Sequence, residues 1–319
     1  MSTSPAVPTV FVTSATGSQG SALCRQLREV GWDVRATTRD PSSPTVTALA
    51  ALGVHFTPGS WDDEDALRAG LEGCDKLFLC LLPNLTDFEQ APRRAQLITK
   101  TARACGVRQA VVSTTLGTAM LDDGGAAPIA PGAFFGAHLA SKQRVEQAVV
   151  DAGFEHWTIL RPAFFMANFI APKIEFGYTE TRDRSTWTNC MTPDSPLSLV
   201  DHVDIARFAA AAFRDPGAFH GRRIGVASEE ILVQDALDRL AAAIGDGRAI
   251  KAIFMGDEEI AKAQAEGSWL FFASEPCCRY MSDYTDMAEL VRLVPGLTTF
   301  EQFLEREREG VRQTYGVHC

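Results

Sequence analysis

Residues 9–20 read TVFVTSATGSQG. The β-branched and aromatic residues at 9–12 are typical of a buried strand, and a helical pattern follows the glycine at position 20. A strand, a tight glycine turn and a helix N-terminus gather backbone N–H groups at one spot, which favours an anion. Gly17 would let the backbone approach a pyrophosphate and Gly20 would let the helix pack close to the strand. Thr16, Gly17, Gln19 and Gly20 are therefore predicted to bind a dinucleotide. An ordinary structural turn is the alternative, because Ser14 stands where a three-glycine fingerprint has its first glycine.

Outward from this stretch, short β-rich runs alternate with helical stretches up to about residue 160. Strands are expected at residues 9–12, 33–38, 54–57, 76–81, 109–113 and 157–160. The helix after Gly20 is expected to bury Leu23, Leu27 and Val30 and to end at Gly31. This alternation predicts an α/β fold with a Rossmann-type, doubly wound parallel sheet.

The regular alternation stops after Pro162, where loop-rich segments lead to short strands and helices. Such C-terminal parts commonly cover the crevice at the carboxyl ends of the strands. Residues 1–162 are thus predicted to form an NADP(H)-binding Rossmann domain. Residues 163–319 are predicted to form mostly a smaller C-terminal substrate lobe, with some elements returning to the Rossmann core.

Composition excludes several classes of protein. With 46% hydrophobic and 22% charged residues the chain is globular, and its net charge of −10 is the wrong sign for a nucleic-acid partner. No apolar run approaches the ~18 residues of a membrane span, and the first 24 residues lack the pattern of a signal peptide. Eight scattered cysteines without a Cys-x-x-Cys pair indicate reduced thiols, and the histidines form no metal-binding pattern. A cytoplasmic protein with no metal and no membrane association is expected.

The residue after the second expected strand indicates which dinucleotide binds. Arg39 stands where an NAD enzyme holds an acid, and a guanidinium pairs with a 2′-phosphate, so NADP(H) is the predicted cofactor. The alternative is a charged turn in which Asp40 neutralises Arg39. After the third expected strand, Asp62 is predicted at the adenine edge of the site. The simpler interpretation of the neighbouring Trp61 is that it packs on the surface.

The ends of later strands supply further candidates, because carboxyl ends of parallel strands meet at one edge of a sheet. Leu82 and Pro83 follow the fourth expected strand and are predicted beside the pyrophosphate or the nicotinamide-side ribose. Two more residues that close or follow the sixth strand, Pro162 and Phe164, are predicted to contact the cofactor. Phe165 and Asn168 are predicted to contact substrate; packing of the two lobes is the alternative role of these aromatics.

Residues 137–153 predict a helix whose apolar stripe includes Val145 and Val149. Steps of three and four residues back along this stripe reach Lys142 and then His138, so both polar side chains are expected on the inward face. A lysine aimed at a sheet needs anions or water, which a nicotinamide ribose and a strand end would supply. The alternative is a lysine that reaches out to solvent.

Four segments together resemble the NmrA-like family, atypical members of the short-chain dehydrogenase/reductase superfamily. They are Ala15-Thr16-Gly17-Ser18-Gln19-Gly20, Thr38-Arg39-Asp40-Pro41, His138-Leu139-Ala140-Ser141-Lys142 and Leu160-Arg161-Pro162-Ala163-Phe164. The resemblance covers residue 10 to about 170 and continues more loosely through residues 199–206. It implies a Rossmann-type domain that prefers NADP(H), in a family split between reductases and redox-sensing regulators of transcription.

The resemblance also implies roles for individual residues. A typical superfamily reductase has Tyr-x-x-x-Lys, where the tyrosine gives a proton to the carbonyl and the lysine holds the nicotinamide ribose. Here Lys142 keeps the lysine position and His138 replaces the tyrosine, so both are predicted to be catalytic, with His138 or a bound water relaying the proton. Ser113 and Thr114 lie where such a reductase keeps a substrate-binding serine, and are predicted to contact cofactor and substrate respectively. An ordinary turn is the alternative at this strand end.

The expected function is an NADPH-dependent oxidoreductase acting on a small, fairly apolar metabolite, in secondary metabolism. Two alternatives stay open: an NADP(H)-sensing regulator that acts on a protein partner without turnover, and an enzyme that keeps the cofactor but catalyses a non-redox rearrangement.

Overall fold

A computed structural model describes residues 7–122, 134–266 and 275–316 of the chain. The chain forms two compact units. Unit 1 comprises Met1–Thr115, Ala140–Arg161 and Ile205–Ile224, and unit 2 comprises Leu116–Leu139, Pro162–Asp204 and Gly225–Cys319. The units interleave along the chain, so neither is one continuous segment. The division into an NADP(H)-binding and a substrate-binding domain stays a prediction.

A seven-stranded sheet with the strand order β10-β6-β5-β4-β1-β2-β3 organises unit 1. Its strands are β1 (Thr9–Val12), β2 (Asp33–Thr38), β3 (Val54–Pro58), β4 (Lys76–Cys80), β5 (Gln109–Ser113), β6 (His156–Pro162) and β10 (Arg222–Val226). The six expected strands are confirmed, and β1 to β6 pair in parallel register. The strand order reverses between β1 and β4, which is where doubly wound sheets bind their ligands. The seventh strand, β10, comes from beyond the expected boundary.

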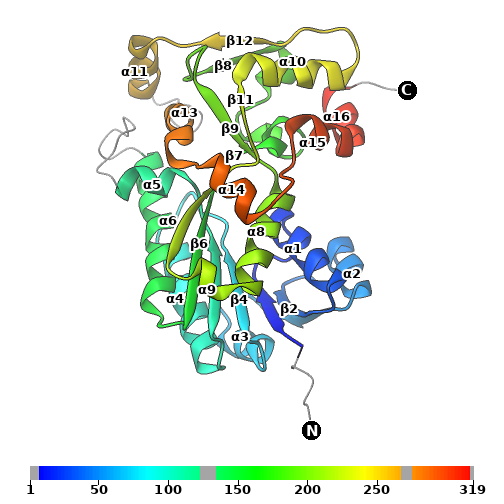
Figure 1. Ribbon diagram of the computed structural model, residues 1–319, viewed down its shortest axis with the longest axis vertical. Helices are drawn as coiled ribbons and strands as arrows, with labels where there is room; N and C mark the ends of the chain where they lie inside the picture. Colours follow the sequence, from blue (N-terminus) through cyan, green and yellow to red (C-terminus); the bar gives the residue numbers. More distant parts are fainter. Residues whose placement is uncertain (1–6, 123–133, 267–274, 317–319) are drawn as a thin grey trace. The chain divides into compact units, whose positions relative to one another are not determined.

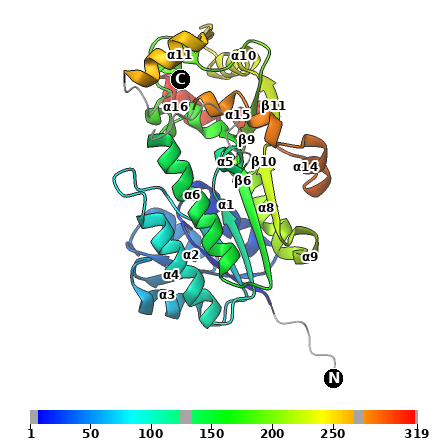
Figure 2. The same cartoon turned by 90° about the vertical axis from the view of Figure 1, so that its left-hand side faces the viewer.

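Helices cover both faces of this sheet, as the doubly wound prediction requires. α3 (Glu64–Leu71), α4 (Gln90–Ala104) and α6 (Phe134–Asp151) lie on one face, and α1 (Ser18–Glu29) and α2 (Pro44–Ala51) on the other (Figures 1 and 2). The first face buries an apolar core that includes Phe11, Leu67 and Val149. Two later helices, α8 (His202–Arg214) and α9 (Pro216–Phe219), directly precede β10 in the sequence.

The first helix differs from expectation at its end. α1 buries Leu23 and Leu27 as predicted, but Val30 is 54% exposed. The chain leaves the helix at Val30 and turns through Gly31 at φ +77°, so the apolar stripe stops one turn earlier than expected.

Unit 2 contains two small sheets and several short helices. One sheet has the order β11-β9-β7, from β11 (Glu229–Leu232), β9 (Pro196–Val200) and β7 (Phe164–Phe165); the other pairs β8 (Thr186–Asn189) with β12 (Lys251–Phe254). The α-helices are α5 (Gly117–Asp122), α7 (Glu180–Asp183), α10 (Val233–Ile244), α11 (Asp257–Ala265), α13 (Glu275–Cys278), α14 (Met287–Leu293), α15 (Phe300–Arg306) and α16 (Arg308–Tyr315). In the described part of unit 2, 3-10 turns also occur at Met166–Phe169, Lys173–Phe176 and Met281–Tyr284.

Among the described residues, no helix is long and apolar enough to cross a bilayer.

Candidate functional site

The turn between β1 and α1 has the strand–turn–helix form that the sequence predicts. Gly17 caps the N-terminus of α1, and its N–H donates to the carbonyl of Ser14 at 2.8 Å. Ser14 adopts φ +48°, the left-handed conformation that a fingerprint glycine supplies without strain. Its hydroxyl donates to the carbonyl of Cys80 at 2.8 Å, which ties the turn to the end of β4. A serine can therefore stand in the first glycine position.

The two glycines of the turn are required for different reasons. A Cβ on Gly20 would lie 2.2 Å from the carbonyl oxygen of Ser14 and 2.9 Å from the Cα of Ala15, so the close approach of helix and turn excludes any side chain. A Cβ on Gly17 would meet only the Ser14 oxygen, at 3.2 Å, and the Ser14 Cβ at 3.8 Å. The fold alone thus demands glycine at 20 but only weakly at 17.

Arg39 follows β2 directly and is exposed. Within the described part of the chain it makes no ion pair, and the carboxylate of Asp40 is bound instead by Ser42, through its N–H at 2.9 Å and its hydroxyl at 2.5 Å. These bonds, the hydroxyl first, lower the pKa of Asp40. The alternative for Arg39 was a turn in which Asp40 neutralises its charge. In the structure the Asp40 carboxylate binds Ser42 instead, so Asp40 does not occupy the Arg39 guanidinium.

Asp62 has a structural partner of its own. Both of its carboxylate oxygens accept from Arg94 of α4, with the Arg94 Nε at 2.8 Å, and this pairing lowers the pKa of Asp62. Its N–H donates to the hydroxyl of Ser60, and Trp61 packs partly against the core. This packing agrees with the simpler interpretation of Trp61. The contact of Asp62 with adenine stays a prediction that its ion pair does not favour.

Lys142 lies on the inward face of α6, as the apolar stripe predicts. Its side chain is buried rather than extended to solvent, and its ammonium donates to the carbonyl of Leu81 at 2.7 Å. Burial lowers the pKa of Lys142, an effect that the charge of Cys80 opposes. The next residues, Leu82 and Pro83, are exposed, so the predicted loop and the predicted lysine meet at the carboxyl end of β4.

Ser113 and Gln19 are also brought together. The hydroxyl of Ser113, at the end of β5, donates to the side-chain oxygen of Gln19 at 2.7 Å. Gln19 lies in the first turn of α1 beside Gly17 and Gly20, and Thr16 is exposed in the turn. The bond links the turn between β1 and α1, where a dinucleotide is predicted to bind, to the end of β5.

Sequence reasoning missed a buried ionic cluster next to these residues. Glu146 of α6 accepts from Arg161 of β6 at 2.6 Å and 3.1 Å, and from the hydroxyl of Thr114 at 2.6 Å. The hydroxyl of Thr114 is therefore committed to Glu146, so the predicted substrate contact of this side chain finds no support in the structure. A signal existed, because Glu146 falls four residues after Lys142 on the inward face of a helix.

His138 lies in the second turn of α6, because the helix begins at Phe134 rather than at residue 137. It is half-buried, with its ring centroid 5.8 Å from that of Phe135. It is on the helix and face that the sequence predicts. Its catalytic role stays a prediction.

The site residues predicted at the end of β6 and directly after it lie in unit 2. Phe164 is buried against Phe169 and Trp187, with ring centroids 5.7 Å apart in both pairs, so its ring packs within unit 2. Its contact with the cofactor stays a prediction. The carbonyl of Pro162 accepts from the N–H of Leu116. Phe165 and Asn168 are half-buried, and the ammonium of Lys173 lies 4.4 Å from the Phe165 ring.

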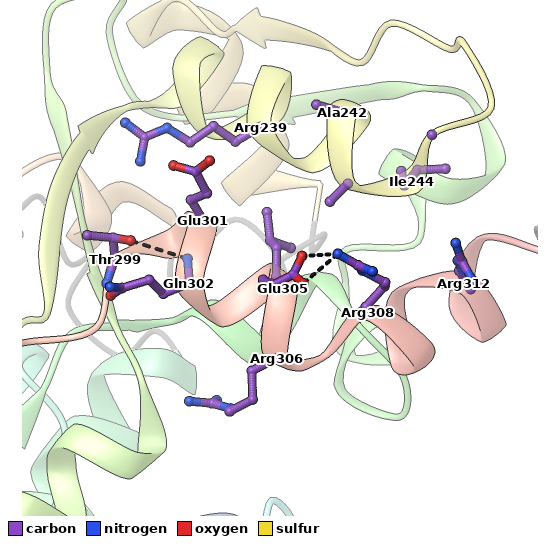
Figure 3. Close-up of a pocket in the computed structure, with 13 residues that line it drawn as sticks. Arg239, Ala242, Ile244, Thr299, Glu301, Gln302, Glu305, Arg306, Arg308 and Arg312 are labelled. Carbon is purple, nitrogen blue, oxygen red and sulfur yellow. Dashed lines mark hydrogen bonds and ion pairs between the residues drawn. The ribbon is translucent and has the colours of Figure 1, made fainter.

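Unit 2 also has a groove of about 1050 Å³ between α10, α15 and α16, and no sequence-predicted residue lines it (Figure 3). Its lining is rich in arginine, but three of these side chains pair with carboxylates: Arg239 with Glu229, Arg306 with Asp201 and Arg308 with Glu305. Charge neutralisation within unit 2 explains these arginines without a ligand.

A model described as the NmrA-like family matches residues 7–265. The chain belongs to the NmrA-like family. The resemblance seen in the four sequence segments is confirmed, and the match extends well into the C-terminal half.

The proteins to which the chain is similar include reductases and a transcriptional regulator. The chain is 31% identical over 208 residues to an NAD(P)H azoreductase of Xenophilus azovorans, covering 65% of this chain and 64% of the relative, just under two thirds of its length. It is 30% identical over 241 residues to a (4-alkanoyl-5-oxo-2,5-dihydrofuran-3-yl)methyl phosphate reductase of Streptomyces griseus, covering 74% of each. Among solved structures it is similar to NmrA, a negative transcriptional regulator, with a TM-score of 0.75 at 17% identity, covering 98% of this chain and 99% of NmrA. The last likeness confirms the Rossmann-type fold.

Proposed function

We propose that this protein is an NADP(H)-dependent oxidoreductase that reduces a small, fairly apolar metabolite. The observation that carries the proposal is Lys142, buried on α6 with its ammonium on the carbonyl of Leu81 at the carboxyl end of β4. A buried ammonium is costly, so its retention at the edge of the sheet where doubly wound folds bind ligands favours a functional role.

The residues at this edge fit a dinucleotide. A Cβ on Gly17 would make one tight contact, 3.2 Å from the Ser14 carbonyl oxygen, so the fold demands glycine there less strictly than at Gly20, and a backbone cradle for a pyrophosphate adds a reason for it. The N-terminus of α1 supplies N–H donors and a positive dipole end there. Arg39 is exposed and makes no ion pair among the described residues, which suits a 2′-phosphate and favours NADP(H) over NAD(H).

The chemistry divides between cofactor and protein. When bound, the reduced nicotinamide supplies a hydride. Lys142 would hold the ribose hydroxyls with the ammonium protons that Leu81 does not take, since an ammonium has three donors. The acceptor also needs a proton, and His138 is the predicted relay because it occupies the position that a tyrosine takes in typical reductases of the superfamily.

The named relatives support reduction over the alternatives, because both are reductases of unsaturated groups: an azo compound in one and an oxo-dihydrofuran in the other. The likeness to a negative transcriptional regulator keeps the sensing function as the second candidate.

The test is incubation of the protein with NADPH and a panel of azo compounds, quinones, enones and aldehydes, following cofactor absorbance and product mass together. Consumption of NADPH with a product two mass units heavier is expected for at least one acceptor, and Lys142→Met should abolish it. Product of unchanged mass without NADPH consumption would establish the rearrangement, and tight NADPH binding without any product would establish the sensor.

A further inference from the structure

A buried ion pair in unit 1 is tied to the two segments that carry candidate site residues. The side chains of Glu146 and Arg161 are 3% and 5% exposed, and Thr114 is buried beside them. Both Glu146 oxygens accept from Arg161, and one also accepts from the Thr114 hydroxyl at 2.6 Å. We call these three residues the Glu146 network.

Stability alone is a weak reason for this arrangement. A buried ion pair carries a desolvation penalty that can exceed the attraction between its charges, and apolar side chains of similar volume often stabilise a fold as well or better. What such a pair provides is a fixed geometry, because each charge strongly disfavours any movement that leaves its partner uncompensated.

The place of the network in the sequence shows what it would fix. Glu146 lies one helical turn after Lys142 on α6, and Thr114 directly follows Ser113 at the end of β5. Lys142 in turn donates to Leu81, and Ser113 donates to Gln19. The network therefore joins the helix that carries Lys142 to the strand ends that carry Ser113 and Arg161.

We propose that Glu146 is a positioning residue, which with Arg161 and Thr114 sets the place of the Lys142 ammonium relative to Ser113 and the dinucleotide turn. The inference rests on the proposed function, in which Lys142 holds the nicotinamide ribose. A helix held by apolar contacts alone could rotate or slide by a fraction of an ångström, and misplacement of that order is enough to lower turnover substantially. Charged hydrogen bonds resist such movement because they are directional.

The first test compares two isosteric substitutions. Thr114→Val removes the hydroxyl bond to Glu146 but leaves the ion pair intact. Thr158→Val is the matched control, because Thr158 is another buried threonine of unit 1, and its hydroxyl donates to the carbonyl of Phe219 at 3.0 Å rather than to the network. Both variants should lower Tm by similar small amounts. Only Thr114→Val should lower kcat with NADPH, by roughly tenfold, and weaken NADPH binding.

The second test removes both charges. Glu146→Met combined with Arg161→Met should fold, because the two opposite charges of the pair are removed together, and should lose at least as much kcat as Thr114→Val. Wild-type turnover in this double variant, or equal kcat in Thr114→Val and Thr158→Val, would overturn the inference.

A readout without substrate separates this inference from the proposed function. The ε-carbon of Lys142, labelled with ¹³C and assigned by loss of its signal in Lys142→Met, reports the surroundings of the ammonium by NMR. Thr114→Val should shift this signal and move its titration midpoint, whereas Thr158→Val should leave both unchanged. If the wild type turns over no acceptor but the signal shifts, the proposed function fails and the positioning role stands. An unmoved signal in Thr114→Val refutes the positioning role whatever the activity.

Discussion

Adding a single methyl group at Gly17 or at Gly20 should separate the role of the fold from the role of the ligand. Gly20→Ala places a Cβ 2.2 Å from the Ser14 carbonyl oxygen, with two further backbone atoms inside 3.0 Å. Ordinary contact begins near 3.4 Å, so the turn or the helix must move by about 1 Å. Ser14 cannot yield freely, because its hydroxyl is bonded to Cys80 and its backbone is already left-handed.

The magnitude follows from two opposing effects at Gly20. Alanine in a helix interior is favoured over glycine by about 1 kcal/mol. Overpacking against backbone costs typically ~1–3 kcal/mol and sometimes more, and the severity of this contact places it at or above the upper end. We expect a net loss of roughly 2–3 kcal/mol, which corresponds to a fall in Tm of about 3–4 °C for a chain of this length.

Gly17→Ala should behave differently. Its Cβ meets one atom at 3.2 Å and alanine is a poorer helix cap than glycine, so the loss without cofactor should be about 1 kcal/mol or less. Saturating NADPH should raise the stability of the wild type by about 2.7 kcal/mol at a hundred times Kd, and Gly17→Ala should lose most of that gain.

Differential scanning fluorimetry with and without NADPH measures both effects. A Gly20→Ala variant as stable as the wild type would refute the packing argument, and a full NADPH shift in Gly17→Ala would refute the assignment of the turn as the pyrophosphate site.

Three other substitutions test the site. Arg39→Ala should reduce the preference for NADPH over NADH by about tenfold or more in calorimetric titration, since a charge-assisted bond to the 2′-phosphate is lost; an unchanged preference would exclude Arg39 from the site. Burial lowers the pKa of Lys142 from 10.5, so the wild type gains stability as pH rises from the pKa of the folded state towards 10.5. The methionine in Lys142→Met does not titrate, so the stability of this variant relative to the wild type should decline between neutral and alkaline pH in denaturant titrations. An increase would contradict the burial argument. His138→Gln should lower kcat by roughly a hundredfold with little change in the Kd for NADPH, and undiminished turnover would place the proton donor elsewhere.

The first six strands could be predicted from the sequence because each is a short run of apolar or β-branched residues with a turn signal at its end. β10 could not, since two of its five residues are arginines and it lies at the sheet edge, half-buried. Its local sequence resembles a charged loop, and only pairing with β6 makes it a strand.

The candidate site residues could be predicted where they belong to a local sequence pattern. Gly17, Gly20 and Lys142 belong to local patterns of turn and helix. The position of Glu146 on the inward face of α6 could be read from its spacing to Lys142, but its pairing with Thr114 and Arg161 could not, because the three residues lie far apart in the sequence. Phe164 shows the same limit in another form: the sequence placed it after β6 but could not tell a packing ring from one that contacts a ligand.

The late position of β10 also bears on how this chain acquires its fold during synthesis. β6 ends at Pro162 and β10 begins at Arg222, so about 60 residues must leave the ribosome before the outer edge of β6 is paired, some 3–12 s at usual elongation rates. Until then β6 presents an open row of backbone donors and acceptors, a template for pairing with another chain. A nascent chain of this protein should accordingly depend most on chaperones in that interval, and a fragment ending at residue 162 should aggregate rather than fold.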